Sequence, residues 1–497
     1  MRNSPSDSNP PIHILDDDSL LNIFYLYQPA VPVDVDIETR PGTFSPPRWG
    51  EWSRERWWHK LSHICQRWRR LIFASASYLG LCLVCTYGTP VARMLECSPA
   101  LPIILDYAHQ TRRWTVADEE GILLALQHRA RVRCIRLFVP RLREGKLFMA
   151  IETEFPVLEY LYVGISSLME VRPSLEIPHS FQAPHLCHLA LSRCSFLVVS
   201  PSLMTSPGLV TLSLKFLPLQ SRHHAYDLFR QLSHLSQLVV LRIAVADGFS
   251  TDESEEEQLD IPFITHFTLP NLRLFEFAGH TNYLETLLPW MTTPLLEKLQ
   301  IIFLPYLTIP NPTYTLPGLL QYMSKADVLG FGSAKFVFNL DGATVWVYPR
   351  EGARVYAFYL RIINQSFGLQ VSDMARIFEG LSPILSTVVD LTLDYSDHNL
   401  TYDGPRPVQW RNLLGSFNHV KTLRVHGIFA ENFSRSLLSD GEPLPEVLPE
   451  LQVLKCPVGC DGSDAFATFV NVRKAAGYPI RLILVGFPGR SSTSTGM

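Results

Sequence analysis

One hydrophobic pattern recurs along the chain: an apolar residue, two variable residues, a second apolar residue, one variable residue and a third apolar residue. The last two apolar residues of each copy are separated by a single position, which places both on the same side of a β-strand. Each copy therefore predicts a short strand with one face toward a core. Ten copies follow in order, beginning at Val132, Leu158, Leu186, Leu209, Leu238, Leu272, Leu296, Val388, Val420 and Leu451.

Between the copies, apolar residues return with helical spacing. Neighbouring copies begin 23 to 34 residues apart, except across the gap before Val388, and this length holds a strand, a turn and a helix. Strand, helix and strand in succession predict an α/β fold, with a parallel sheet and helices on its outer side. We expect the helices over residues 224–235, 282–291, 372–381, 409–417 and 464–476.

These copies resemble leucine-rich repeats of irregular length. The resemblance implies a solenoid over residues 131–487, with a curved parallel sheet and outer helices. Two stretches depart from the repeat. Alternating apolar residues on both sides of Asp341-Gly342 predict an antiparallel ribbon between Lys335 and Ile363, and Asp252–Glu257 predicts a solvated acidic loop.

The N-terminal region has a helical pattern instead. Residues 16–18 are all Asp, and carboxylates are favoured at a helix N-terminus. A second stripe, with apolar residues three or four positions apart, predicts a helix from Trp57 to Leu71. The apolar residues that follow the acidic start within about two turns are Leu20, Leu21, Ile23, Phe24 and Leu26.

Together these two stretches, within residues 12–72, resemble an F-box. Asp16 stands where that family prefers Pro, and residues 28–55 form a longer insertion than a compact F-box has. Combined with the repeats, the pattern is similar to F-box proteins of mushroom-forming fungi. The residues on F-box positions are Leu15, Leu20, Leu21, Ile23, Phe24, Leu26, Trp58, Leu61, Ile64, Cys65, Trp68 and Arg69.

The resemblance implies an adaptor without chemistry of its own. Its F-box would dock on a Skp-type adaptor and thereby on a cullin of a ubiquitin ligase, while the repeats would hold a protein substrate. The alternative is a leucine-rich-repeat scaffold with no ligase link, whose N-terminal helices only cap the solenoid. For the F-box reading, the expected adaptor-binding residues are Leu15, Leu20, Leu21, Ile23, Phe24, Leu61 and Trp68.

The domain organisation follows from these patterns. Tyr78–Cys85 predicts a strand that leads out of the F-box-like region, and a later helix spans Trp114–Arg129, opened by Thr115 or Asp118. We expect a disordered start at 1–11, an F-box-like helical domain at 12–87 with its inserted loop 28–55, a connecting helical segment at 88–130, the solenoid at 131–487 and a disordered tail at 488–497.

Composition places further limits on function. The 497 residues carry a net charge of −4, which gives no reason to expect a nucleic-acid partner. No apolar run is long enough to cross a membrane, and the N-terminus lacks a signal-peptide pattern. The cysteines are odd in number and lie mostly within apolar runs, as reduced thiols do. We therefore expect an intracellular protein, cytoplasmic or nuclear.

Motifs for catalysis, cofactors or metals are weak. The sequence has no nucleophile elbow, phosphate loop or His-Glu-x-x-His motif. Gly330-Phe-Gly332 opens a strand-like run and not a helix, which argues against a phosphate site. Cys82 and Cys85 have chelating spacing, but a structural zinc needs four ligands. We expect no enzyme activity, no cofactor and no metal.

The repeat pattern also predicts a partner surface. Its variable third and fifth positions point away from the core, along the other face of the sheet. Because Tyr and Arg most often anchor interfaces, we expect substrate to bind at Tyr160, Tyr162, Arg242 and Arg424.

Overall fold

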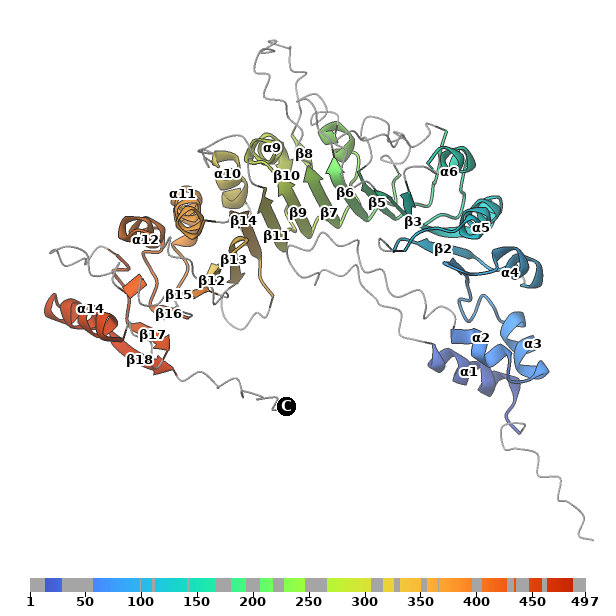
Figure 1. Ribbon diagram of the computed structural model, residues 1–497, viewed down its shortest axis with the longest axis horizontal. Coiled ribbons are helices and arrows are strands. Elements are labelled where there is room, and N and C mark those ends of the chain that lie inside the picture. The colour runs from blue at the N-terminus through green and yellow to red at the C-terminus, as the bar shows by residue number, and fades with distance from the viewer. Residues whose placement is uncertain are drawn as a thin grey trace, which may run out of the picture. The chain divides into compact units, whose positions relative to one another are not determined.

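The structure is a computed structural model, and its chain divides into two compact units, residues 1–220 and 221–497, which we describe separately. Each unit has mixed α/β structure, with a mostly parallel sheet and helices (Figure 1). The structure describes residues 14–28, 57–98, 100–109, 112–140, 144–166, 180–193, 206–217, 228–245, 266–304, 316–325, 331–349, 355–364, 366–395, 405–426, 433–434, 447–457 and 463–485.

Three short helices open the first unit: α1 (Asp17–Tyr27), α2 (Trp57–Ser62) and α3 (Gln66–Ala74). We call them the N-terminal helical module. The single helix predicted from Trp57 to Leu71 is wrong, because the Cys65 side chain caps a new helix. Its sulfur accepts a hydrogen bond from the Trp68 backbone N–H at 3.5 Å, which satisfies a donor that a helix start leaves unpaired.

The sheet of the first unit follows this module. Its neighbouring strands run parallel from β1 to β6 in chain order, as the repeat pattern predicts. The strands are β1 (Leu83–Thr86), β2 (Ile103–Tyr107), β3 (Val132–Pro140), β4 (Tyr160–Ser166), β5 (His188–Ser192) and β6 (Thr211–Leu217).

Helices α4 (Val91–Cys97), α5 (Val116–Leu126) and α6 (Glu144–Ile151) accompany this sheet (Figure 1). As expected, Thr115 caps α5, and it does so through a reciprocal pair of hydrogen bonds with Asp118. Two predictions need correction. The segment 88–130 contains β2 and is not only helical, and the strand predicted over Tyr78–Cys85 begins only at Leu83. Neither β2 nor the real start of β1 has the repeat pattern.

The sheet of the second unit has the order β7-β9-β11-β14-β13-β12-β15-β16-β17-β18. All its neighbouring pairs are parallel except those that involve β13. Its strands are β7 (Val240–Val245), β9 (Leu274–Gly279), β11 (Lys298–Phe303), β12 (Phe331–Asn339), β13 (Gly342–Pro349), β14 (Phe358–Ile363), β15 (Asp390–Tyr395), β16 (Thr422–Val425), β17 (Val453–Pro457) and β18 (Arg481–Val485).

The predicted antiparallel ribbon is confirmed in this sheet. β13 pairs antiparallel with both β12 and β14, and the turn between β12 and β13 is Leu340-Asp341, immediately before Gly342. Gly342 has a φ of 156°, and a Cβ there would collide with the backbone carbonyl of Ile362. Glycine is therefore required where the hairpin meets its neighbouring strand.

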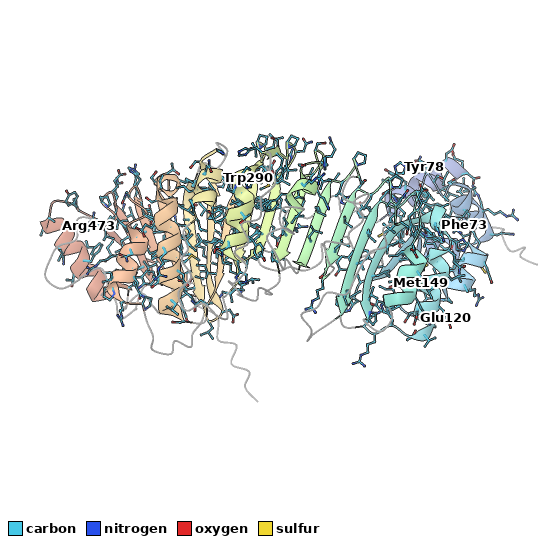
Figure 2. All side chains as sticks on the ribbon, turned by 90° about the horizontal axis from the view of Figure 1, so that it is seen from above. Phe73, Tyr78, Glu120, Met149, Trp290 and Arg473 are labelled. Carbon is cyan, nitrogen blue, oxygen red and sulfur yellow. The ribbon has the colours of Figure 1, made fainter. Side chains whose placement is uncertain are left out.

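Helices α9 (Thr281–Leu287), α10 (Pro317–Lys325), α11 (Phe367–Leu385), α12 (Pro407–Leu414) and α14 (Ser463–Ala475) lie side by side along the sheet of the second unit (Figure 2). Four of the five predicted helices correspond to α9, α11, α12 and α14, and the fifth overlaps a helical segment at 228–232. Arg473 on α14 is buried and donates to the carbonyls of Val447 and Pro449, which ties this helix to the segment before β17.

All ten copies of the repeat pattern form strands, and their apolar positions are buried. Leu241, Phe275, Leu299 and Leu423, for example, are each 0% exposed. These residues form the core between strands and helices, and we call the opposite side of each sheet its second face. The acidic stretch Asp252–Glu257 and the predicted disordered ends, 1–11 and 488–497, lie outside the described residues.

Candidate docking sites

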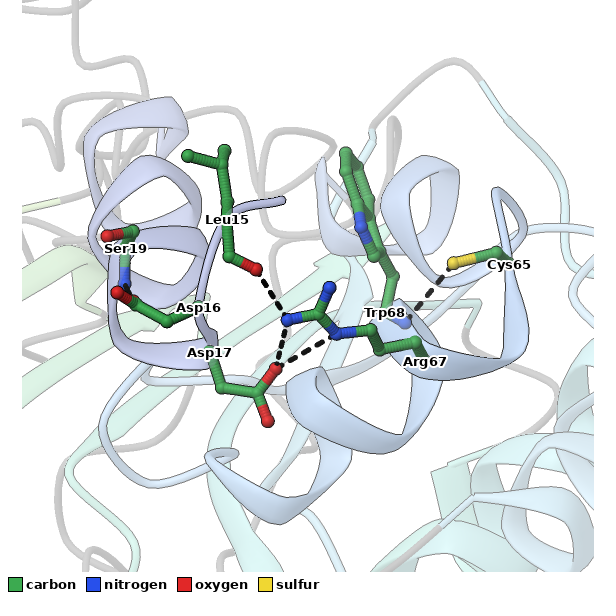
Figure 3. Close-up of polar contacts among 7 residues, drawn as sticks. All are labelled: Leu15, Asp16, Asp17, Ser19, Cys65, Arg67 and Trp68. Atoms are coloured by element: carbon green, nitrogen blue, oxygen red, sulfur yellow. Dashed lines mark hydrogen bonds and ion pairs between the residues drawn. The ribbon is translucent and has the colours of Figure 1, made fainter. Parts of the chain in front are cut away.

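The start of α1 is fixed by the acidic residues that the sequence singled out (Figure 3). The Asp16 carboxylate accepts a hydrogen bond from the Ser19 backbone N–H at 2.6 Å, and this bond lowers the pKa of Asp16. Asp16 is thus the N-cap of α1. An Asp at this position therefore stabilises the helix start directly, because its carboxylate accepts a hydrogen bond from a backbone N–H that would otherwise be unpaired.

Arg67 joins α1 to α3 (Figure 3). Its Nη2 lies 2.7 Å from the Asp17 carboxylate and 2.6 Å from the carbonyl oxygen of Leu15, and its Nε also donates to Asp17 at 3.0 Å. One planar guanidinium therefore holds two residues at the α1 start, Leu15 and Asp17. Sequence reasoning missed this contact, because helical spacing does not show which residues meet across two helices.

The interior of the N-terminal helical module uses most of the residues predicted to bind an adaptor. Leu20 and Phe24 are 0% exposed, and the Phe24 ring meets the Trp68 ring edge-on with centroids 4.8 Å apart. Leu61 and Trp68 are buried as well. Leu20 and Phe24 were predicted to bind an adaptor, but neither is accessible at the surface of the module. A module of three short helices has few apolar side chains, and it uses these for its own core.

Other apolar side chains of the module remain at its surface. Ile23 is 45% exposed and Leu26 is 82% exposed, one turn apart on α1. Ile64, in the turn between α2 and α3, is 59% exposed. Leu15 and Leu21 are half-buried. Of the predicted adaptor-binding residues, Ile23 is thus the most accessible, with Leu15 and Leu21 partly so.

The predicted substrate-binding residues differ greatly in accessibility. Tyr162 and Arg242 are 5% and 3% exposed, so the prediction that they present a free binding surface is wrong. Tyr160 is half-buried, and Arg424 is exposed. All four lie on second faces, as the alternation predicts. A side chain on a second face is nevertheless not always exposed to solvent, as Tyr162 and Arg242 show.

The second face of the first unit is mainly apolar and uncharged. One row of neighbouring positions crosses its strands, and in it the Tyr160 and His188 rings stack at 4.3 Å. Burial lowers the pKa of His188 to about 4, because a charged imidazole would lose hydration there. The row runs through Val84, Ile104, Cys134, Tyr160, His188 and Thr211.

The second face of the second unit is charged and aromatic. Arg242 and Glu276 form a buried ion pair at 3.1 Å, with side chains 4% and 5% exposed. Beside them Gln300 donates to the Tyr356 hydroxyl at 2.6 Å, and burial raises the pKa of Tyr359 to about 12. The corresponding row runs through Arg242, Glu276, Gln300, Tyr359, Trp346, Lys335, Thr392, Arg424 and Lys455.

Positive charge dominates on this face. Among its described strand positions, seven are Lys or Arg and three are Asp or Glu, whereas the whole chain has a net charge of −4. The alternation of strand positions assigns to it the cations Arg242, Lys298, Lys335, Arg361, Arg424, Lys455 and Arg481, and the anions Glu276, Asp390 and Asp394.

Within the described part of the chain, no group of three or more His, Cys, Asp or Glu side chains is arranged to hold a metal ion. Cys82, just before β1, and Cys85, within β1, are buried cysteines that form no disulfide. None of the described helices is long and apolar enough to cross a membrane.

Comparison with known proteins adds no relative: no protein-family model and no curated protein sequence matches this chain.

Proposed function

We propose that this protein is a substrate-recognition adaptor of a Skp/cullin/F-box ubiquitin ligase. Its N-terminal helical module would dock on a Skp-type adaptor, and its strand-and-helix repeats would form a solenoid that holds a protein substrate. The order of the elements supports this, because a small helical module precedes a long series of strands built from one repeated pattern.

The exposure of Ile23, Leu26 and Ile64 carries the proposal. The module already fills its interior with Leu20, Phe24 and Trp68. Ile23 and Leu26 lie one turn apart on the same helix, and exposed apolar side chains that cluster, unlike scattered single ones, are typical of an interaction surface. A helical partner with a complementary apolar groove would cover them.

The proposal predicts that Ile23→Asp combined with Leu26→Asp abolishes co-purification with the Skp-type adaptor. Both positions are exposed, so each substitution should change the free energy of unfolding by less than about 0.5 kcal/mol. In a docked complex the same carboxylates would be desolvated, at a cost of about 2 kcal/mol or more. Tagged protein would be isolated, and the adaptor and cullin scored.

Val116→Asp with Met149→Asp is the matched control. These side chains are 64% and 77% exposed on α5 and α6, and the double variant introduces the same charge outside the module. It should retain the adaptor. Equal adaptor recovery from both folded double variants would refute the proposed docking site.

The alternative is a repeat scaffold whose N-terminal helices only cap the sheet. One observation favours it: α1 contacts the chain that leads to β1, through Gln28 Nε2 to the Leu79 carbonyl at 2.8 Å and through the Tyr25 and Tyr78 rings. In that case wild-type protein would recover neither adaptor nor cullin, and deletion of residues 1–74 would lower the melting temperature.

A further inference from the structure

We propose that the basic part of the second face in the second unit, where Arg424 is exposed and Lys335 and Lys455 are half-buried, binds an acidic, aromatic-containing segment of a partner protein. This inference deepens the proposed function, since such a segment would be the part of the substrate that the repeats recognise. We call the site the basic strip, and define it as Lys335, Arg424 and Lys455 on β12, β16 and β17.

The strip is continuous across neighbouring strands. Lys335 lies opposite Thr392, Thr392 opposite Arg424, and Arg424 opposite Lys455. Because paired strands are about 4.8 Å apart, the three cations fall along a line of about 15 Å. An extended peptide that crosses the strands would meet them in turn.

The cations of the strip are poorly neutralised. Lys335 pairs with Asp394 at 3.2 Å, but for Arg424 and Lys455 no carboxylate lies within ion-pair distance in the described part of the chain. Like charges directly opposite each other on a sheet are destabilising, and Arg424 and Lys455 occupy such a pair. Bound carboxylates would remove this repulsion.

The positive charge of the strip also affects the pKa of a histidine at the same end of the sheet. Burial lowers the pKa of His426, and the charges of Lys335 and Arg424 lower it further, against the opposing effect of Asp394. The positive charges of the strip thus act together on their surroundings.

An aromatic group borders the strip. Trp346 lies directly opposite Lys335, is half-buried, and meets the Tyr359 ring at 5.8 Å. Trp and Arg side chains together are typical of protein interfaces. Asp390 and Asp394 stand among the cations and would repel any anion beside them, so the carboxylates of the bound segment must lie over the cations of the basic strip.

Fluorescence anisotropy with a labelled peptide of alternating Glu and Phe tests the inference. Wild-type protein should bind it, with an affinity that falls as salt is raised, and should not bind the peptide with Gln in place of Glu. Arg424→Glu with Lys455→Glu should weaken binding at least about tenfold. Arg424→Gln with Lys455→Gln, which adds no negative charge, should have a smaller effect in the same direction.

Arg230→Glu with Lys474→Glu is the control, because both side chains are exposed and the change in net charge is the same. It should bind as wild type. Equal weakening by both reversals, equal binding of the Gln peptide, or preferential binding of single-stranded oligothymidylate would overturn the inference.

The peptide-binding experiment and the adaptor co-purification experiment can fail independently of each other. A chain that recovers the adaptor but does not bind the acidic peptide refutes the basic strip alone. A chain that binds the peptide but recovers no adaptor refutes the ligase link alone. The Ile23 and Leu26 double variant should still bind the peptide, because its substitutions lie in the other unit.

Discussion

The two units differ in the residues that occupy the second face of the sheet. In the first unit the face carries Val84, Ile104 and Cys134, and the one ion pair between its described strand positions joins Arg136 and Asp106 at 3.1 Å. In the second unit the equivalent positions carry ion pairs, aromatic rings and a surplus of cations. The repeat pattern fixes only the core face, so it leaves the second face available for different functions.

The largest expected effect concerns the buried ion pair of the second unit. Glu276→Ala leaves the Arg242 guanidinium buried without its carboxylate, which should cost about 3–5 kcal/mol of unfolding free energy. Arg242→Met with Glu276→Leu should regain most of this, because it removes both charges. Urea denaturation followed by circular dichroism measures both variants.

The ion pair of the first unit is the comparison. The side chains of Arg136 and Asp106 are 13% and 24% exposed, so water can partly solvate the remaining partner. Asp106→Ala should therefore cost only about 1 kcal/mol. If the two single substitutions cost the same, the distinction between the two second faces is wrong.

A smaller change in the free energy of unfolding is expected from the first unit when the pH is lowered. The folded pKa of His188, about 4, is below its ordinary value of 6.5, so the folded state prefers the neutral ring. This contribution to the free energy of unfolding is fully present above pH 6.5 and is lost as the pH falls toward 4, by an amount on the order of 3 kcal/mol. His188→Asn should flatten this part of the pH–stability profile, as measured by urea denaturation. An unchanged profile would show that His188 is accessible to water.

The smallest effect is expected from reductant. None of the seven cysteines in the described part of the chain forms a disulfide, so reductant should leave the melting temperature unchanged. Iodoacetamide should modify exposed Cys97 in the native protein and spare Cys134, because Cys134 is buried and burial raises the pKa of its thiol. Mass spectrometry after brief labelling reads both positions. Rapid modification of Cys134 would contradict an apolar, closed second face in the first unit.

The sequence predicted the strands well, because each copy of the repeat places two apolar residues on one side of a strand. It also located the hairpin, where alternation continues on both sides of Asp341-Gly342. It failed for β2 and β18, which lack the repeat. It also failed to divide the helix at Cys65, since the apolar spacing continues through a turn that only the Cys65 cap reveals.

The binding residues were harder to predict for a physical reason. Periodicity assigns a residue to a face, but burial depends on what packs against that face. Phe24 was expected at a surface and instead meets Trp68, and Arg242 was expected in solvent and instead pairs with Glu276. Lys335 was not chosen, because its strand lies outside the regular copies, yet the sheet brings it into line with Arg424.

The Arg67 contact has a consequence for how this chain can vary. It joins residues 50 positions apart, and forming it closes a loop through the segment between α1 and α2. The entropy of closing a flexible loop grows only with the logarithm of its length, so doubling the loop adds about 0.6 kcal/mol. Related chains could therefore gain or lose many residues between these helices and still assemble the same module, provided that Asp17 and Arg67 are kept.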